Sequence, residues 1–539
     1  MTSSFKQCYD FIIVGGGSAG CVLADKLSAS GQYQVCLIEA GPKDSSPLIH
    51  IPLGVVELMK SRRLNWLYNS GPEASQNDRE IFNPRGKTLG GSSSVNAMLY
   101  IRGQKEDYDH WRDLGNEGWG FDDVLPYFKA TQHQERGADE YHGVDGPLNV
   151  AESRSKLPIF DNFIQSAINA GFPANNDFNG EQQEGIGYFQ VTQKDGKRCS
   201  AAKAFLTPNL SRKNLTVITD ALVEKVIIED KKAVGIRFKR KQKVIELGAN
   251  KEVILSAGAF NSPQLLMLSG IGPQGELAKH NIPLIHQLEG VGQNLQEHVD
   301  ALVVKEYTDT DIIAYRPKAL AKLVPSAFKF FTEQSGVLTS AVAEAGGFIK
   351  TSDEAETPDL QLHFIPAAMD DHGRNLKMLF KYGVAIHACL LRPKSRGCVT
   401  LYGSAPHLNP NITLNMLSHP DDQALMIKAI KRAREIFAQP PVANKVSNEI
   451  FPGEACQSDE DILEFLKNKA STIYHPVGTC KMGQDELAVV DNELRVHGID
   501  SLRVVDASIM PTVVSGNTNA PTIMIAAKIA DNILATHQC

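Results

Sequence analysis

A glycine-rich turn near the start of the chain limits the folds that this sequence can adopt. Residues 10–14 (DFIIV) predict a short buried parallel strand that leads into the pattern G-x-G-x-x-G, with glycines at Gly15, Gly17 and Gly20. In such a unit the first glycine permits a tight turn, the second lets the backbone approach a pyrophosphate, and the third lets the helix pack against the strand. The N-terminus of that helix offers unpaired N–H groups to phosphates. The turn therefore predicts an α/β unit that binds a dinucleotide.

An acidic residue lies where such units bind a ribose. A second strand is expected at residues 34–38 and ends at Glu39, 19 residues after Gly20. A carboxylate there bonds a ribose hydroxyl and repels the 2′-phosphate of NADP. The strand, helix and acid together favour dinucleotide binding over an ordinary strand–helix connection. They leave NAD and FAD open as alternatives.

Composition excludes several other classes of protein. The chain is 42% hydrophobic, and 55 Lys and Arg against 62 Asp and Glu give a net charge of −7, too small and too evenly spread for a nucleic-acid partner. No apolar run approaches the roughly 18 residues of a membrane-spanning helix, and residues 1–10 lack a secretion signal. Nine scattered cysteines, without a C-x-x-C pair or a histidine cluster, predict reduced thiols and no metal site. We therefore expect a cytoplasmic protein.

Three further segments have unusual composition. Residues 85–103 (RGKTLGGSSSVNAMLYIRG) are rich in Gly and Ser yet carry apolar side chains, which predicts a loop that packs under something apolar. Residues 253–272 (VILSAGAFNSPQLLMLSGIG) predict a strand, a tight turn at Gly258 and a helix. Residues 472–483 (TIYHPVGTCKMG) place His475 beside a proline.

These segments resemble the signatures of the glucose–methanol–choline (GMC) oxidoreductases, which bind FAD. The resemblance rests on residues 85–103 and 258–272, in the family's order after the first glycine-rich turn, and it extends from Asp10 to near Leu534. It selects FAD over NAD. Some members tether the flavin through a histidine, but Val95 stands at the matching position here, so we expect non-covalent FAD.

The resemblance implies that FAD contacts come from the whole length of the chain. With the residues of the first turn, the expected FAD contacts are Gly15, Gly17, Ser18, Gly20, Glu39, Ala40, Trp66, Arg85, Gly91, Ser92, Asn96, Ala97, Met98, Val223, Ala257, Gly258, Asp506, Ala507, Thr518 and Asn519. A last helix is expected to start near Asn519. Its positive end would stabilise the anionic reduced flavin by roughly 0.3–2 kcal/mol.

The resemblance also implies roles for two residues near the C-terminus. Alone, His475 fits a structural histidine and Asn517 a loop residue, but the family places a catalytic histidine and its His-or-Asn partner at these positions. Oxidation of an alcohol removes a hydroxyl proton and a hydride, and a neutral imidazole is suited to take the proton. An amide can donate to the developing alkoxide. We expect His475 to be the general base and Asn517 its partner, although their roles could partly exchange.

The expected fold class is α/β (α+β overall), with a Rossmann-like FAD-binding domain made of residues 1–155, 197–300 and 465–539. Residues 156–196 and 301–464 are expected to form a discontinuous substrate-binding domain. Segments of this part alternate in polarity, as in LQLHFIPA from Leu360 onward. The resemblance implies that they form an antiparallel sheet over the flavin.

The substrate pocket is less constrained by the sequence. Glu344 falls where choline-acting members carry a glutamate, and Trp66 and Phe364 fall at or near aromatic positions that would hold a quaternary ammonium group. Alkanol-type relatives keep the same glutamate context, and Glu344 also fits an ordinary loop acid. With 7% aromatic residues, the sequence favours an apolar pocket for an aliphatic or aromatic primary alcohol, with choline as the alternative.

The resemblance therefore implies an FAD-dependent alcohol dehydrogenase that forms an aldehyde and passes electrons to a quinone or another carrier. An oxidase that uses oxygen, a lyase with structural FAD and a non-catalytic flavoprotein are the other hypotheses. A quinone acceptor implies peripheral contact with the inner face of the membrane. The sequence predicts no nucleic-acid partner and leaves the oligomeric state open.

Overall fold

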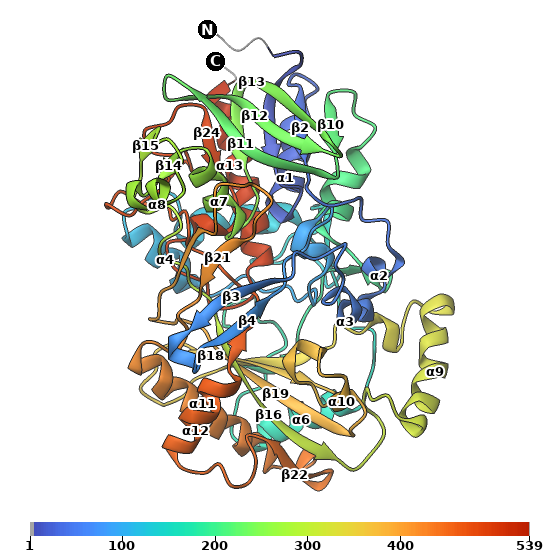
Figure 1. Ribbon diagram of the computed structural model, residues 1–539. Helices are drawn as coiled ribbons and strands as arrows, with labels where there is room; N and C mark the ends of the chain where they lie inside the picture. Colours follow the sequence, from blue (N-terminus) through green and yellow to red (C-terminus); the bar gives the residue numbers. More distant parts are fainter. Residues whose placement is uncertain (1–4, 538–539) are drawn as a thin grey trace.

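A seven-stranded sheet carries the glycine-rich turn at one end of the molecule (Figure 1). The computed structural model describes residues 5–537. Five strands of this sheet run parallel, and the other two pair antiparallel along one edge. The parallel strands are β10 (Leu215–Ile218), β2 (Val35–Ile38), β1 (Cys8–Val14), β13 (Lys243–Leu255) and β24 (Leu502–Val504), and the antiparallel ones are β12 (Lys232–Arg240) and β11 (Ala221–Glu229).

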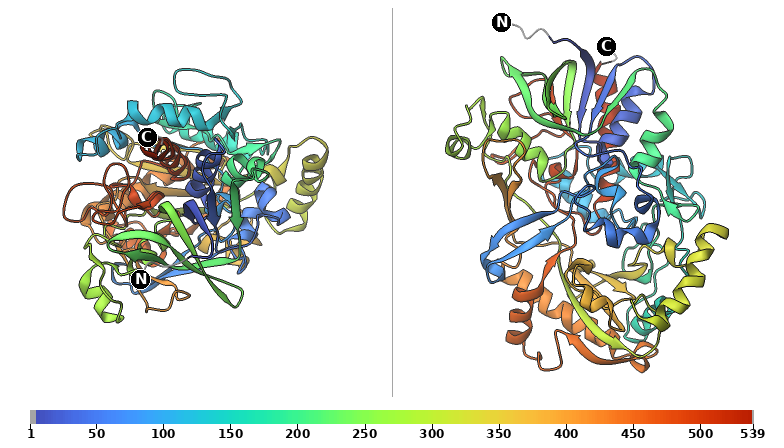
Figure 2. Two further views of the ribbon diagram at one scale, coloured as in Figure 1. Left: turned by 90° about the horizontal axis from the view of Figure 1, so that it is seen from above. Right: turned by 45° about the vertical axis from the view of Figure 1, so that its right-hand side comes forward.

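Helices from the two ends of the chain pack side by side against this sheet. α1 (Ser18–Ser28) follows β1, and α13 (Asn519–His537) lies beside it (Figures 1 and 2). The Ser18 hydroxyl donates to Asn519 Oδ1 at 2.7 Å, 501 residues away in sequence. β1 and β2 are buried on both faces, as parallel strands covered by helices are. The predicted Rossmann-like α/β unit is confirmed.

A second sheet forms the other half of the molecule. Its strands all pair antiparallel, as predicted for the substrate-binding part. In spatial order they are β22 (Val446–Phe451), β16 (Val299–Tyr307), β19 (Gly383–Leu390), β18 (Leu360–Ile365), β17 (Ala345–Ile349) and β7 (Gly185–Tyr188), with β23 (Ser471–Thr472) beside β16. Three helices cover one face: α6 (Ile159–Asn169), α11 (Pro420–Phe437) and α12 (Asp459–Lys469).

The two faces of this second sheet have different surroundings. On β18, Leu362 and Phe364 join the core under the helices, whereas His363 and Ile365 point to the opposite side. This follows from the period of two along a strand. The sheet thus presents one face to its helices and the other to the first domain.

The predicted domain boundaries remain a prediction. The boundary at 464/465 falls inside α12, and the chain pairs once more with the second sheet through β23 before it returns to the first. Within residues 5–537, no helix combines the length and hydrophobicity needed to cross a bilayer.

Candidate active site

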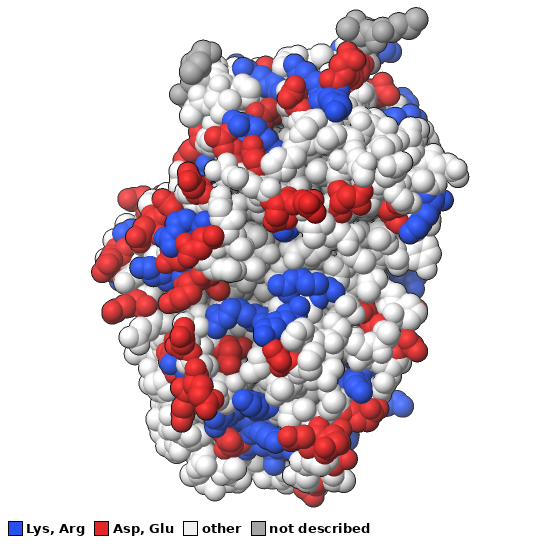
Figure 3. All heavy atoms as spheres, turned by 90° about the vertical axis from the view of Figure 1, so that its left-hand side faces the viewer, with Lys and Arg blue, Asp and Glu red and all other residues white. Residues whose placement is uncertain are grey.

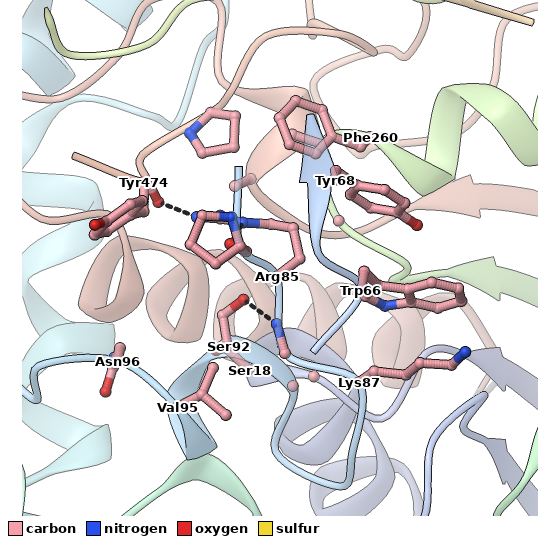
Figure 4. A pocket seen from close by; sticks show the side chains of 18 of the residues that line it. Ser18, Trp66, Tyr68, Arg85, Lys87, Ser92, Val95, Asn96, Phe260 and Tyr474 are labelled. Carbon is pink, nitrogen blue, oxygen red and sulfur yellow. Dashed lines mark hydrogen bonds between the residues drawn. The ribbon is translucent and has the colours of Figure 1, made fainter. Parts of the chain in front are cut away.

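A cavity of about 490 Å³ lies between the two sheets and is lined by residues from both. At one end, which we call the nucleotide end, the walls come from the glycine-rich turn and from residues 85–99. At the other, the sheet end, they come from β16, β18 and β19. Figure 4 shows one wall, where Arg85 reaches toward Tyr474 and Ser92, Val95 and Asn96 lie below them in the view.

Glycines at the nucleotide end let backbone segments pack closely against one another. A Cβ on Gly91 would lie 2.7 Å from the Gly17 Cα, so the two predicted signatures meet here, glycine against glycine. A Cβ on Gly20 would lie 1.9 Å from the Gly15 carbonyl oxygen, which explains why α1 needs a glycine there. Gly15, Gly17 and Gly91 line the cavity, so backbone groups face it where the motif would hold a pyrophosphate.

Two carboxylates fix the turns around this end. Glu39 accepts hydrogen bonds from the Gly16 N–H at 2.9 Å and the Gly41 N–H at 2.7 Å. Burial raises the pKa of Glu39 to about 7 against the opposing effect of these bonds. Asp506 accepts from the Gly258 N–H at 2.8 Å. Both acids line the cavity where the sequence places contacts to FAD.

The structure brings the predicted FAD contacts together. All of them line the cavity except Gly20, which packs α1 against its strand instead. Val95 also lines the cavity and is visible in Figure 4. A valine side chain offers no nucleophile for a covalent link to flavin. The set therefore fits FAD held by non-covalent contacts.

His475 and Asn517 lie together in the cavity wall, within a chain of hydrogen bonds. His475 Nε2 lies 3.1 Å from Asn517 Nδ2, and His475 Nδ1 lies 3.0 Å from His298 Nδ1. His298 Nε2 lies 3.0 Å from the Leu391 carbonyl, which can only accept, so this nitrogen carries the proton. Gln361 Nε2 donates to Asn517 Oδ1 at 3.1 Å, which orients the amide.

The tautomer of His475 follows from this chain. Because His298 Nδ1 is then an acceptor, the proton of neutral His475 resides on Nδ1. Its Nε2 carries the lone pair, which accepts a hydrogen bond from Asn517 Nδ2. The arrangement leaves an accepting nitrogen and an amide donor side by side in the cavity.

Burial keeps both histidines neutral. It lowers the pKa of His475 well below the usual value, helped by the neighbouring His298, and it lowers the pKa of His298 to about 4. Buried Glu297 accepts hydrogen bonds from the backbone N–H groups of His298 at 2.9 Å and His475 at 2.7 Å. Arg85 donates to the Tyr474 carbonyl at 2.7 Å. These contacts fix the backbone on both sides of the imidazole pair.

The sheet end combines apolar walls with paired polar groups. His387 Nδ1 lies 2.7 Å from Asp300 Oδ2, and the Cys389 thiol donates to Asp300 Oδ1 at 3.3 Å. Burial alone would lower the pKa of His387, but the Asp300 carboxylate raises it above its usual value. Burial lowers the pKa of His363 and of His372 to about 3. The apolar wall residues are Val55, Val56, Met59, Leu99, Ala341, Val342, Ala343, Ile365 and Met369.

The structure does not bring the two predicted substrate residues to the cavity. Glu344 is buried and accepts hydrogen bonds from the hydroxyls of Ser153, Ser155 and Ser340, and burial raises its pKa to about 7. Phe364 stacks on Phe163 with ring centroids 4.6 Å apart, on the helix side of β18. Neither side chain lines the cavity.

Sequence reasoning missed several residues that the structure gathers here. Glu297, His298 and Asp300 come from one short stretch, EHVD, at the start of β16. His363 and His387 come from the apolar strands β18 and β19. The sequence did contain one indication of these residues, namely polar side chains within otherwise apolar strands. Buried polar side chains require hydrogen-bond partners, so such residues are expected to cluster.

The absence of a metal site stays a prediction. Among residues 5–537, one group of side chains has suitable geometry for a cation: Asp139, His142 and Asp177. His142 Nε2 bonds Asp177 at 2.7 Å, and Asp139 accepts from two backbone N–H groups of its own loop. None of the three lines the cavity.

Comparisons with known proteins agree with this arrangement. Family models described as GMC oxidoreductase match residues 9–300 and 393–526. An alcohol dehydrogenase [acceptor] of Pseudomonas putida is 48% identical over 98% of this chain and 96% of its own length. Mouse mitochondrial choline dehydrogenase is 43% identical over 98% of this chain and 90% of its own. A formate oxidase of Aspergillus oryzae superposes with a TM-score of 0.91 at 28% identity, covering 99% of this chain and all of that one.

Proposed function

The chain belongs to the GMC oxidoreductase family, and on that premise we propose that it oxidises a primary alcohol to the aldehyde with FAD as cofactor. The observation that carries the proposal is the hydrogen-bond chain through His298, His475 and Asn517, which leaves an accepting nitrogen in the cavity. The 48% identity to a protein named alcohol dehydrogenase [acceptor] supports it.

The chain's residues divide between holding the cofactor and moving a proton. Bound FAD supplies the acceptor for the hydride that leaves the alcohol carbon. Gly17 and Gly91 give the pyrophosphate access to the backbone, and Glu39 lies at the ribose position of the motif. With Val95 at the tethering position, we propose that FAD is bound without a covalent link.

His475 takes the proton from the substrate hydroxyl. Its Nε2 accepts the proton, and the resulting imidazolium keeps its bond from Nδ1–H to His298 Nδ1. Asn517 Nδ2 then donates to the alkoxide oxygen, while Gln361 holds the amide in place through Oδ1. The alcohol loses one proton to His475 and one hydride, which leaves a carbonyl group.

The sheet end favours a neutral alcohol over choline. Asp300 is the carboxylate that lines this end, and its charge is balanced by His387 at 2.7 Å. This pairing leaves Asp300 with less net charge to attract a quaternary ammonium group. The apolar walls from α3 (Val55–Leu58) and residues 341–343 instead suit an aliphatic or aromatic chain.

We propose a quinone as the electron acceptor, with oxygen as the alternative. The named relatives include both an acceptor-dependent alcohol dehydrogenase and oxygen-dependent choline dehydrogenases. A quinone dissolved in the bilayer requires peripheral contact between this chain and the membrane, on its inner face if the protein is cytoplasmic. Measuring oxygen uptake in the presence of substrate distinguishes a quinone acceptor from oxygen. Rapid peroxide formation would contradict a quinone acceptor.

The deciding experiment mixes the holoenzyme anaerobically with octanol, benzyl alcohol or choline and records the absorbance of oxidised flavin. We expect the first two alcohols to bleach the flavin and choline to leave it oxidised. Bleaching by choline alone would make choline the substrate. An unchanged flavin spectrum with every alcohol would point to a lyase or a non-catalytic flavoprotein.

A further inference from the structure

α9 (Pro317–Thr332) is apolar on two faces, one of which has no partner. Its inner face, with buried Ala319 and Phe330, packs on the short helix η6 (Val337–Thr339). Its outer face exposes four large apolar side chains, and Phe328 and Phe331 are 68% and 73% exposed. A helix that is hydrophobic on both sides is normally buried on both. The outer residues, spaced 4, 4 and 3 apart, are Leu320, Val324, Phe328 and Phe331.

The exposed stripe continues onto the neighbouring short helix α10 (Leu376–Leu379). Leu376 and Phe380 are exposed, and the Phe380 ring centroid lies 5.9 Å from that of Tyr315. Among the described residues, every exposed phenylalanine lies on this part of the molecule. Contiguous exposed apolar surface of this kind marks an interaction site. We call it the α9–α10 surface, made of Tyr315, Leu320, Val324, Phe328, Phe331, Leu376 and Phe380.

The two segments that form this surface carry a net positive charge, although three of their basic side chains are paired with the acids Asp309, Glu333 and Asp371. Residues 316–333 and 371–381 hold seven Lys and Arg against two acids, Asp371 and Glu333, whereas the chain has a net charge of −7. On the opposite side of the molecule, basic and acidic side chains are intermixed (Figure 3). The basic residues are Arg316, Lys318, Lys322, Lys329, Arg374, Lys377 and Lys381.

The α9–α10 surface lies next to a wall of the cavity. η6 contacts both α9 and the turn η1 (Pro52–Gly54), which continues into α3. Val55 and Val56 of α3 line the cavity, and Met378 of α10 belongs to the same apolar cluster as Val55. An apolar cluster thus connects α10 to the cavity wall, and η6 joins α9 to the same wall through η1.

We propose that the α9–α10 surface docks the protein onto a lipid bilayer that carries anionic headgroups. α9 projects from the body of the molecule (Figure 2), so it can lay its outer face into the boundary between headgroups and acyl chains. The long lysine side chains reach past the apolar stripe to phosphate groups. A second copy of the chain fits less well, because a symmetric contact would bring two segments of net positive charge against each other.

This inference deepens the proposed function, because a bilayer is the source of both an apolar alcohol and a quinone. Docking itself requires no turnover and can be measured without substrate. Failure to dock would therefore leave the flavin-reduction result of the proposed function intact. Failure of flavin reduction would likewise leave docking intact.

The test is flotation of the FAD-loaded protein with vesicles of phosphatidylcholine, alone or mixed equally with phosphatidylglycerol. We expect flotation with the anionic vesicles and little with the neutral ones. Phe328→Ser and Phe331→Ser should each weaken partitioning by about tenfold, because each removes a buried aromatic ring from the bilayer contact. Flavin reduction by benzyl alcohol should match that of the unaltered protein, which shows that each variant is folded.

The matched control is Tyr402→Ser, which removes a side chain that is 72% exposed and lies outside the α9–α10 surface. It should leave flotation unchanged. Absence of flotation by the unaltered protein overturns the proposal, as does equal loss in the Tyr402 variant. A dimer in light scattering that Phe331→Ser converts to a monomer, without vesicle binding, would instead assign the surface to a second copy of the chain.

Discussion

The two ends of the cavity are built in different ways. The nucleotide end is shaped by missing side chains, where Gly17 faces Gly91, and by carboxylates bound to backbone N–H groups. The sheet end is shaped by side chains from three strands, with Asp300 and His387 paired across β16 and β19. A substitution at the nucleotide end must displace backbone atoms, whereas a substitution at the sheet end replaces a single side chain. Cofactor binding and substrate choice should therefore be separable by mutation.

The largest effect is expected at His475, where the two ends meet. His475→Ala removes the group that we propose as acceptor of the hydroxyl proton, so the rate of anaerobic flavin reduction should fall by about 10²–10⁴-fold. FAD should remain bound, because the residues of the nucleotide end are unchanged. Stopped-flow absorbance measures the rate, and the flavin to protein ratio measures retention.

His110→Ala is the matched control, because His110 is an exposed histidine in α4 (Lys105–Asp113), outside the cavity. It should reduce flavin at the normal rate. Normal reduction by His475→Ala would remove the base from the mechanism. Loss of FAD from that variant would show that the two ends are not separable.

Gly91→Ala should affect the nucleotide end alone. The added Cβ would lie 2.7 Å from the Gly17 Cα, and Gly91 has a φ of +52° that L residues rarely adopt. We expect affinity for FAD to fall by roughly 10–100-fold, since backbone strain and steric conflict cost about 1–3 kcal/mol. Titration of the apoprotein with FAD measures the change.

Gly115→Ala separates strain from steric conflict. Gly115 has a φ of +94°, yet a Cβ there meets no atom within 4 Å. This variant should lose some stability and keep its affinity for FAD. If both variants lose FAD equally, the close approach of Gly17 and Gly91 has no special role.

Asp300→Asn tests the pairing of Asp300 with His387 at the sheet end through the pH dependence of stability. The pKa of His387 is raised in the folded protein, so its protonated form stabilises the fold below about pH 6.5, and this stabilisation is lost as pH rises through the raised value. The variant should be less stable by roughly 1–3 kcal/mol at low pH, and the difference should shrink as pH rises. Melting temperatures across a pH series measure it. A difference that grows with pH would contradict the assignment.

The smallest effect is expected for Glu344→Gln. Glu344 is enclosed by three serine hydroxyls and does not line the cavity, so KM for benzyl alcohol and for choline should each change by less than about twofold. The KM values of Asp300→Asn, which alters a residue that lines the cavity, provide the comparison in the same assay. A large change in choline KM for the Glu344 variant would return this residue to substrate recognition.

Much of the nucleotide end could be predicted from the sequence because its main parts are short contiguous motifs. Gly15, Gly17 and Glu39 lie within one strand–turn–helix–strand unit, whose geometry follows from local spacing. The second signature brings Gly91 and its neighbours as one segment. Motifs of this kind carry their own structure, and a resemblance to a family transfers them intact.

The sheet end could not be predicted in the same way, because register decides which side chains enter the cavity. Phe364 and His363 are adjacent, and an assignment that is off by one residue exchanges the core face for the cavity face. The partnership of Asp300 with His387 depends on pairing between strands 87 residues apart. No local pattern specifies that distance.

The bond between Ser18 and Asn519 has a consequence for how the protein matures. The wall that α13 contributes cannot form until the segment from residue 519 onward has left the ribosome. FAD therefore meets a finished binding site only after residues 15–522 have all been made, so the first glycine-rich turn cannot hold the flavin in its final site during most of their synthesis.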